Sequence, residues 1–194
     1  MSKKTLALFI AVWAVMLKAP AVLTATAAST ATLTLTVTVA PSPSVWIGVT
    51  NYDFGNMPAS AISISQTSIA VINDSEGLTE KYSIRASDAR NNGLHSSPTD
   101  WNLASSTGTD QYNLRAVFKA DLPGDSDFDG ANDSLTNDPI TCDGTKFATG
   151  ADEDGYNSIK GKEEHLWFRI ATPSSVKDTN EHTIFITITA MGMD

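Results

Sequence analysis

The sequence predicts an all-β protein: an antiparallel β-sandwich, immunoglobulin-like or jelly-roll, with a long acidic loop inserted into it. Three observations predict this fold class. Apolar and polar residues alternate with period two in several short runs, clusters of Asn, Asp, Gly and Pro separate the runs, and no amphipathic helical pattern follows the first 27 residues. Such alternation is typical of strands that bury one face, and strands of this kind pack as two facing sheets. The two topologies fit the pattern equally well.

Residues 1–27 are predicted to be a secretory signal peptide. Lys3 and Lys4 precede an apolar run of twelve residues, 6–17, and the Ala-Thr-Ala sequence at 25–27 is a suitable cleavage site. The apolar run is shorter than the roughly 18 to 20 residues that a membrane span needs. We therefore expect a secreted protein, extracellular or on the cell surface, with no membrane segment after signal removal.

Residues 28–43 are predicted to form an alternating strand followed by a stiff proline linker. Apolar residues alternate strictly with threonine over 32–39, and Pro41 and Pro43 follow. The segment is either the first strand of its own sandwich or a strand that is added to the sheet of another copy. In the second case, one copy contacts the next through these apolar side chains: Leu33, Leu35, Val37 and Val39. Because that contact runs head to tail, it propagates into a fibre.

Residues 44–194 are predicted to form one β-sandwich domain. Its strands are expected, in order, at 45–49, 62–65, 68–72, 81–86, 112–119, 166–170 and 184–189. The interruption between the fifth and sixth of these, residues 121–162, has little periodicity and many Asp, Asn and Gly residues. A loop of this length inside a compact domain is usually functional or disordered.

Charge is concentrated in this loop. The net charge of the whole chain is −9, and it becomes about −12 when the three lysines before residue 28 are removed. Ten of the 22 acidic residues lie between Asp121 and Asp154, and Lys146 is the only basic residue in that span. Such a surface repels nucleic acid and anionic lipid and attracts cations.

The run from Asp125 to Asp133 has the spacing of a calcium-binding loop, with carboxylates at positions 1, 3, 5 and 9 and Gly130 at position 6. Calcium takes six to eight oxygen ligands. The predicted Ca²⁺ ligands are the carboxylates and one main-chain carbonyl of the loop, with a residue near position 12: Asp125, Asp127, Asp129, Ala131, Asp133, and Thr136 or Asp138. Residues 125–136 resemble the loops of EF-hands, dockerins and thrombospondin type 3 repeats, except that Thr136 stands where an EF-hand has a bidentate Glu.

No catalytic motif is found, because His95, His165 and His182 stand alone, with no HExxH sequence and no paired metal-ligand spacing. We therefore expect a protein that is not an enzyme. Cys142 is the only cysteine, so the fold has no internal disulfide. Secreted β-sandwiches often bind sugars through exposed aromatic residues, and Trp101 and Trp167 are the candidates for contact with a surface glycan.

The sequence thus predicts a secreted structural surface protein, a subunit of a pilus, filament or surface layer, with a calcium-ordered loop and copies of itself as partners. In architecture it resembles the donor-strand pilins and biofilm-fibre subunits of bacteria and archaea. The alternative is a secreted carbohydrate-binding or adhesin module.

Overall fold

The computed structural model describes residues 34, 36–37, 40–91, 96–150 and 153–193. The predicted signal peptide, together with Leu33, Leu35 and Val39 of the alternating segment, lies outside the described residues. Residues Val39–Asp194 form a compact unit that is separate from the segment ending at Thr38. The two units are described separately below.

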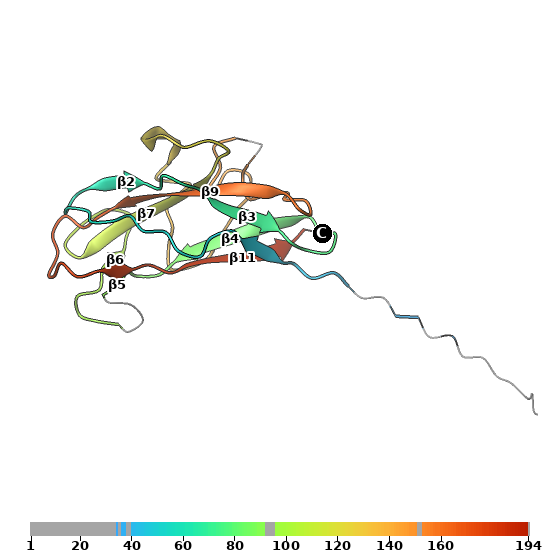
Figure 1. Cartoon of the computed structure of the whole chain (residues 1–194), viewed down its shortest axis with the longest axis horizontal. Coiled ribbons are helices and arrows are strands. Elements are labelled where there is room, and N and C mark those ends of the chain that lie inside the picture. The colour runs from blue at the N-terminus through green and yellow to red at the C-terminus, as the bar shows by residue number, and fades with distance from the viewer. Residues whose placement is uncertain (1–33, 35, 38–39, 92–95, 151–152, 194) are drawn as a thin grey trace, which may run out of the picture. The chain divides into compact units, whose positions relative to one another are not determined.

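The domain is an all-β sandwich, as predicted, and its two sheets face each other (Figure 1). The larger sheet has the order β1-β3-β9-β7-β6, and β2 pairs with β9 beyond the end of β3. The smaller sheet has the order β11-β4-β8, and β5 pairs separately with β10. The strands are β1 (Val45–Ile47), β2 (Ile62–Ile64), β3 (Ile69–Asn73), β4 (Glu80–Ala86), β5 (Arg90–Asn91), β6 (Asn102–Leu103), β7 (Gln111–Phe118), β8 (Ile140–Thr141), β9 (Glu163–Ala171), β10 (His182–Thr183) and β11 (Ile186–Gly192). All pairs are antiparallel except β6 with β7.

The core lies between the two sheets and is built by the alternation that predicted the strands. In β4 the inward residues Tyr82, Ile84 and Ala86 are buried, while Arg85 is exposed. The same alternation places apolar side chains of β7 and β9 on the core side: Tyr112, Leu114, Ala116, Phe118, Leu166, Phe168 and Ile170. The register aligns the two strands, with Ala116 opposite Phe168. Burial of these side chains is the main source of the stability of the sandwich.

The outer face of the larger sheet is also covered, which the sequence pattern did not indicate. Val117 of β7 and Trp167 of β9 point away from the main core, yet they are 0% and 6% exposed. They form a second apolar cluster with Phe128 of the acidic loop and with Ile64 of β2. The acidic loop therefore lies over β7 and β9 and turns their outer face into a small additional core.

Gly155 marks the place where the end of the acidic loop passes closest to the core. Its φ of +65° lies in the left-handed region, and a Cβ atom there would lie 2.5 Å from the Phe118 ring and 2.7 Å from the Cys142 sulfur. Only glycine fits both the conformation and the space.

Candidate functional sites

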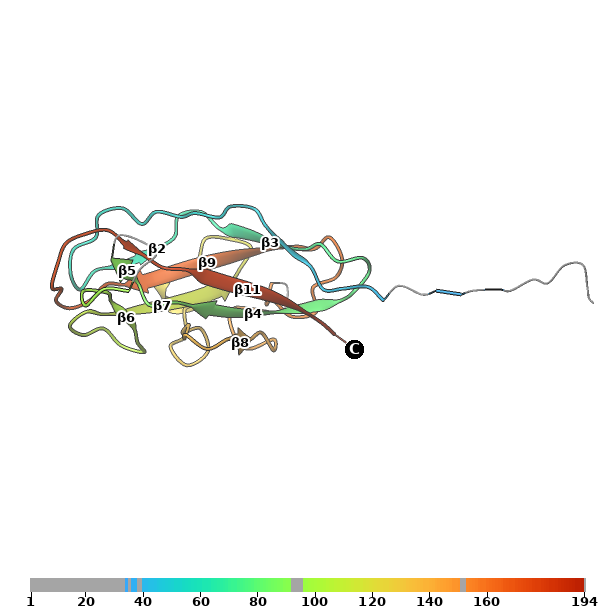
Figure 2. The same ribbon diagram turned by 90° about the horizontal axis from the view of Figure 1, so that it is seen from below.

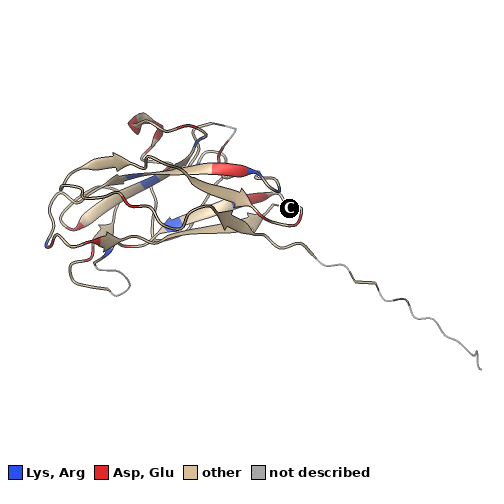
Figure 3. Ribbon diagram, in the orientation of Figure 1, with Lys and Arg blue, Asp and Glu red and all other residues tan. Residues whose placement is uncertain are grey.

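The acidic loop begins with a short 3-10 turn, η1 (Asp125–Asp127), whose carboxylates pair with basic side chains of the sheet beneath it. Figure 3 shows acidic positions in this turn and basic positions on the strands of the sheet. Arg169 Nε donates to Asp125 Oδ1 at 2.5 Å, and Lys119 Nζ donates to Asp127 Oδ2 at 2.7 Å. These hydrogen bonds hold the pKa values of both carboxyl groups below their usual range, because each favours the charged form. Two of the predicted calcium ligands are therefore engaged by protein cations.

The other two carboxylates of the calcium pattern are used in the turn of the loop itself. Asp129 accepts hydrogen bonds from the Ala131 N–H and the Asn132 side chain. Asp133 is buried, and it accepts from the N–H groups of Asp129 (2.6 Å) and Phe147 (3.1 Å). Burial raises the pKa of Asp133 to about 6, since it disfavours the charged form.

The remaining predicted ligands also have partners within the protein. The Ala131 carbonyl accepts a hydrogen bond from Lys146 Nζ at 3.0 Å. The hydroxyl of Thr136 donates to the Asp138 carbonyl, and the carbonyl of Thr136 accepts from Ala86 of β4. In the described part of the chain, no three His, Cys, Asp or Glu side chains are grouped so that they would hold a metal ion.

In this arrangement, the predicted oxygen ligands do not fit a calcium ion, because they do not converge on one point. Calcium binding by the loop stays a prediction. It requires Asp125 and Asp127 to exchange Arg169 and Lys119 for the ion, a replacement of one positive partner by another.

Contacts within the protein join the first half of the loop to the sheet. The Phe128 ring is buried in the outer-face cluster, and its carbonyl accepts a hydrogen bond from Arg115 Nη1 at 2.9 Å. The basic side chains that reach the loop are Arg115 of β7, Lys119 directly after β7, and Arg169 of β9. An apolar anchor and a set of basic side chains thus hold the first half of the loop on the sheet.

Two buried carboxylates outside the calcium pattern fix the ends of the neighbouring segments. Glu80 accepts the N–H of Ser44 at 2.8 Å and so holds the chain where the proline linker enters β1. Glu164 accepts from the N–H groups of Asp154 and Gly155 and pairs with Lys162 at 2.9 Å. Both are fully buried, and no periodicity in the sequence distinguished them from solvent-exposed acids.

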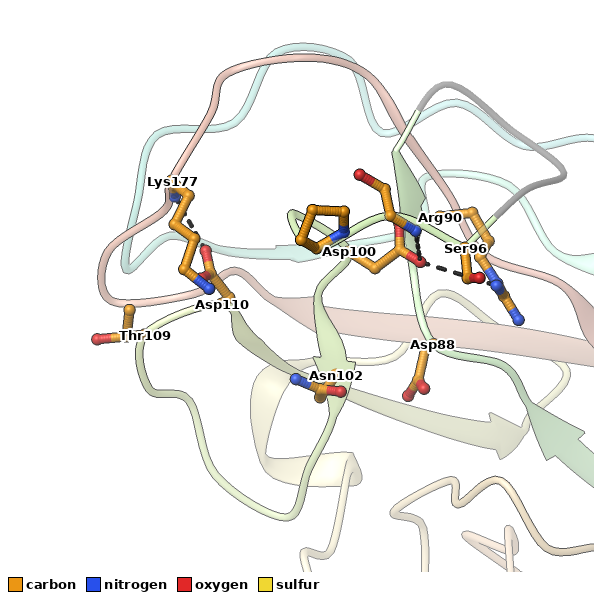
Figure 4. Close-up of a pocket in the computed structure, with 10 residues that line it drawn as sticks. Asp88, Arg90, Ser96, Asp100, Asn102, Thr109, Asp110 and Lys177 are labelled. Carbon is orange, nitrogen blue, oxygen red and sulfur yellow. Dashed lines mark hydrogen bonds and ion pairs between the residues drawn. The ribbon is translucent and has the colours of Figure 1, made fainter.

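A polar cleft of about 460 Å³ lies at the end of the domain that carries β5, β6 and β10 (Figure 4). Figure 4 shows two ion pairs in its lining, Lys177 with Asp110 at 2.8 Å and Arg90 with Asp100 at 3.7 Å. The Lys177 ammonium lowers the pKa of Asp110, and hydrogen bonds from main-chain N–H groups, that of Asn91 first, lower the pKa of Asp100. Sequence reasoning missed this cleft because the polar residues of 88–110 have no motif spacing and only the fold brings Lys177 to them.

The two candidate glycan-contact residues have different surroundings. Trp167 is 6% exposed, and its indole N–H donates to the Lys119 carbonyl at 2.7 Å, so it packs beneath the loop and offers no stacking face. Trp101 is half-buried and stacks on His182, with ring centroids 4.0 Å apart. Its chain neighbours Asp100 and Asn102 line the cleft.

The alternating N-terminal segment is described only in part. Thr34, Thr36 and Val37 are exposed and belong to no strand, and Val37 is 84% exposed. The linker residues 40–43 are exposed as well, and the first strand of the sandwich begins at Val45. The other three predicted contact residues, Leu33, Leu35 and Val39, fall outside the described residues.

Comparison with protein-family models, with curated proteins and with solved structures finds no match to this chain. Among the residues that the structure describes, no helix has the length and apolar character of a membrane span.

Proposed function

We propose that this chain is a secreted structural subunit of the cell surface that assembles head to tail with copies of itself through residues 32–39. The observation that supports this most is the exposure of Val37, 84%, in an alternating segment whose described residues belong to no strand. Such an apolar strand pattern gains little by staying in water, and it gains most when another chain supplies a sheet edge.

The free energy of one contact between two subunits is a small difference between large terms, so assembly should depend strongly on protein concentration. Burying Leu33, Leu35, Val37 and Val39 contributes about 1.5 to 3 kcal/mol for each side chain. Ordering eight residues costs about 1 to 2 kcal/mol for each residue. The two sums are similar, so the main-chain hydrogen bonds of the new ladder, about 0.5 to 1.5 kcal/mol each, decide the sign.

The test compares two double variants of the mature chain, residues 28–194, that place the same charges on opposite faces of one strand. Leu35→Asp with Val37→Asp should abolish filaments in negative-stain electron microscopy and give monomers in sedimentation. Thr34→Asp with Thr36→Asp should leave filaments in place, because the threonine face points away from the acceptor.

The same pair of variants separates assembly from the alternative role of residues 32–39 as an ordinary core strand. If the segment belongs to its own sandwich, Leu35→Asp with Val37→Asp lowers the free energy of unfolding of the monomer by several kcal/mol. Assembly in trans predicts an unchanged unfolding free energy of the monomer. Wild-type protein that shows no filament with or without calcium would contradict the proposal.

A second candidate function is glycan binding at the polar cleft, favoured by its grouping of Asp, Asn, Arg and Lys side chains (Figure 4) and by Trp101, which lies between Asp100 and Asn102 in the chain. Planar hydrogen-bonding groups next to an aromatic ring are the usual means of holding a sugar. A glycan array should then show binding that Trp101→Ala removes and Trp46→Ala keeps. Trp46 is a fair control because it is 50% exposed on β1, a strand that contributes no residue to the cleft, whereas Trp101 lies between the cleft residues Asp100 and Asn102.

A further inference from the structure

Strand β11 is an edge strand whose outer side has no partner among the described residues. It pairs with β4 over seven residues, and no other strand of the described chain is hydrogen-bonded to it (Figure 2). The direction of its free groups follows from β4. The N–H of Ser87, directly after β4, donates to the Phe185 carbonyl on the β11 side. Tyr82 bonds on the opposite side: its N–H donates to the Gly155 carbonyl, and its carbonyl accepts from the Cys142 N–H.

Successive residues of a strand direct their main-chain groups to opposite edges. The register places Ala190 opposite Tyr82, and Ile188 opposite Ile84. Because the main-chain groups of Tyr82 point away from β11, those of Ala190 also point away from β4, and the same holds for Ile188 and Ile186. Three residues of β11 therefore offer N–H and C=O groups to a further strand.

The side chains of these residues lie at an incompletely buried margin of the core. Ile186, Ile188 and Ala190 are only half-buried, whereas Tyr82 and Ile84 beside them are fully buried. On the larger sheet, the edge residues of β1, Val45 and Ile47, are half-buried too. β1 and β11 belong to different sheets with no ladder between them, and half-buried apolar side chains along these two strands form a seam: Val45, Ile47, Ile186, Ile188 and Ala190.

The edge carries none of the features that normally keep an edge strand from pairing. Natural edge strands are interrupted by proline, bulges or inward charges, or they are covered. Residues 183–193 contain no charged residue and no proline, and β11 pairs with β4 without a bulge. An uninterrupted, uncharged edge of this length is a template for another strand.

Residues 32–39 match this template in length, pattern and charge. The segment has eight residues against seven in β11, its apolar residues alternate with the same period, and residues 19–52 carry no charge. It follows that its apolar side chains can enter the seam while its threonines face water. Pro41 and Pro43 fix the backbone directly behind it and favour an extended linker, which opposes a tight reversal onto the same domain.

We propose that residues 32–39 of a second copy add to the free edge of β11, and that their apolar side chains close the seam between β11 and β1. This inference rests on the proposed function and names its acceptor site. The main chain of the incoming strand bonds to Ile186, Ile188 and Ala190. Each subunit then donates one strand and accepts one.

The test removes a single outward N–H from the acceptor. Ala190→Pro deletes a donor that points away from β4, so the ladder within the subunit is retained. We expect the concentration needed for filaments to rise about 100-fold, which corresponds to about 2.7 kcal/mol. Ala190→Ser keeps the N–H and should assemble like wild type. Circular dichroism and thermal melts check that both variants fold.

A mixing experiment tests the pairing directly. Ala190→Pro keeps its donor segment, and Leu35→Asp with Val37→Asp keeps its acceptor edge. Each variant alone should be monomeric, and an equimolar mixture should form dimers but no filaments in sedimentation.

Two outcomes separate the acceptor from the proposed function. If wild type assembles and the donor variant does not, yet Ala190→Pro still forms filaments, the function stands and the β11 acceptor is wrong. If Ala190→Pro does not fold, cysteine cross-linking replaces it. Leu35→Cys should form disulfide-linked ladders with Ile188→Cys but none with Leu122→Cys, a 53% exposed apolar position elsewhere. The reverse pattern would overturn the inference.

Discussion

Replacement of Phe128 by alanine tests what holds the acidic loop on the sheet. The Phe128 ring is 4% exposed and packs with Val117 and Trp167 on the outer face of β7 and β9. Apart from Pro123, it is the only buried apolar residue that the first part of the loop, 121–134, contributes. If protein contacts order the loop, loss of this ring should release it.

The expected cost follows from the burial of the ring. Phe→Ala in a well-packed core costs about 3 to 5 kcal/mol, and the cost falls where the surroundings can collapse into the space. The outer-face cluster is small and one wall of it is a loop, so we expect about 2 to 3 kcal/mol for Phe128→Ala. The ion pairs of the loop are partly exposed and contribute about 0 to 1 kcal/mol each, which is too little to keep the loop in place.

The assay is chemical unfolding in chelator-containing buffer together with tryptophan emission of the folded protein. Trp167 is buried only where the loop covers it, so its emission should shift to longer wavelength when the loop lifts. Leu122→Ala is the matched control, because this residue of the same loop is 53% exposed and its loss should change stability by no more than about 0.5 kcal/mol. If Phe128→Ala behaves like Leu122→Ala in both measurements, the apolar anchor is not what orders the loop.

Three further predictions concern the same half of the molecule. Gly155→Ala should lower the free energy of unfolding by about 2 to 5 kcal/mol, because it combines left-handed backbone strain with a 2.5 Å contact to the Phe118 ring. Gly161→Ala is the control: its φ is +75° and the space around it is free, so it should cost only the strain of about 1 to 2 kcal/mol. Burial raises the pKa of Asp133 from 3.8 in the unfolded chain to about 6 in the folded state, so the stability that this group contributes falls as pH rises through this window. Between pH 4 and 7 in chelator, unfolding experiments should show wild type losing about 2 kcal/mol relative to Asp133→Asn. If the loop binds calcium with a dissociation constant of about 1 mM, 10 mM Ca²⁺ should stabilise the fold by about 1.4 kcal/mol in thermal melts. The double variant Asp127→Ala with Asp129→Ala should remove that gain. Equal melting of wild type in calcium and in chelator would contradict calcium binding.

The strands were predictable from sequence because their alternation is local. The runs at 81–86, 112–119 and 166–170 correspond to β4, β7 and β9, and their inward residues form the core. The outward residues of β9 were harder to interpret, since Trp167 and Arg169 have the pattern of a wet face. Their burial depends on a loop some 40 residues earlier in the chain, a contact that no local pattern encodes.

The strand at 184–189 was likewise predictable as a core strand, but its place at the edge of a sheet was not. Edge or centre is decided by which strands pair, and that order is a property of the whole fold. The sequence shows that residues 183–193 are uncharged, which is compatible with a buried central strand. Only the order β11-β4-β8 shows that the uncharged strand has a free side.

The acidic run shows most clearly how a local pattern underdetermines a site. Four carboxylates at calcium spacing indicate that positive charge lies near Asp125, but they do not specify whether a metal ion or a basic side chain carries it. In the fold, Arg169, Lys119 and Arg115 reach the loop from strands that are remote in sequence, and Lys146 reaches the Ala131 carbonyl. A calcium ion would therefore have to compete with cations that are tethered at the loop and lose little further entropy on binding. That competition lowers the affinity of the loop for calcium below what its spacing alone would give, and it allows the loop to stay folded over β7 and β9 without the ion.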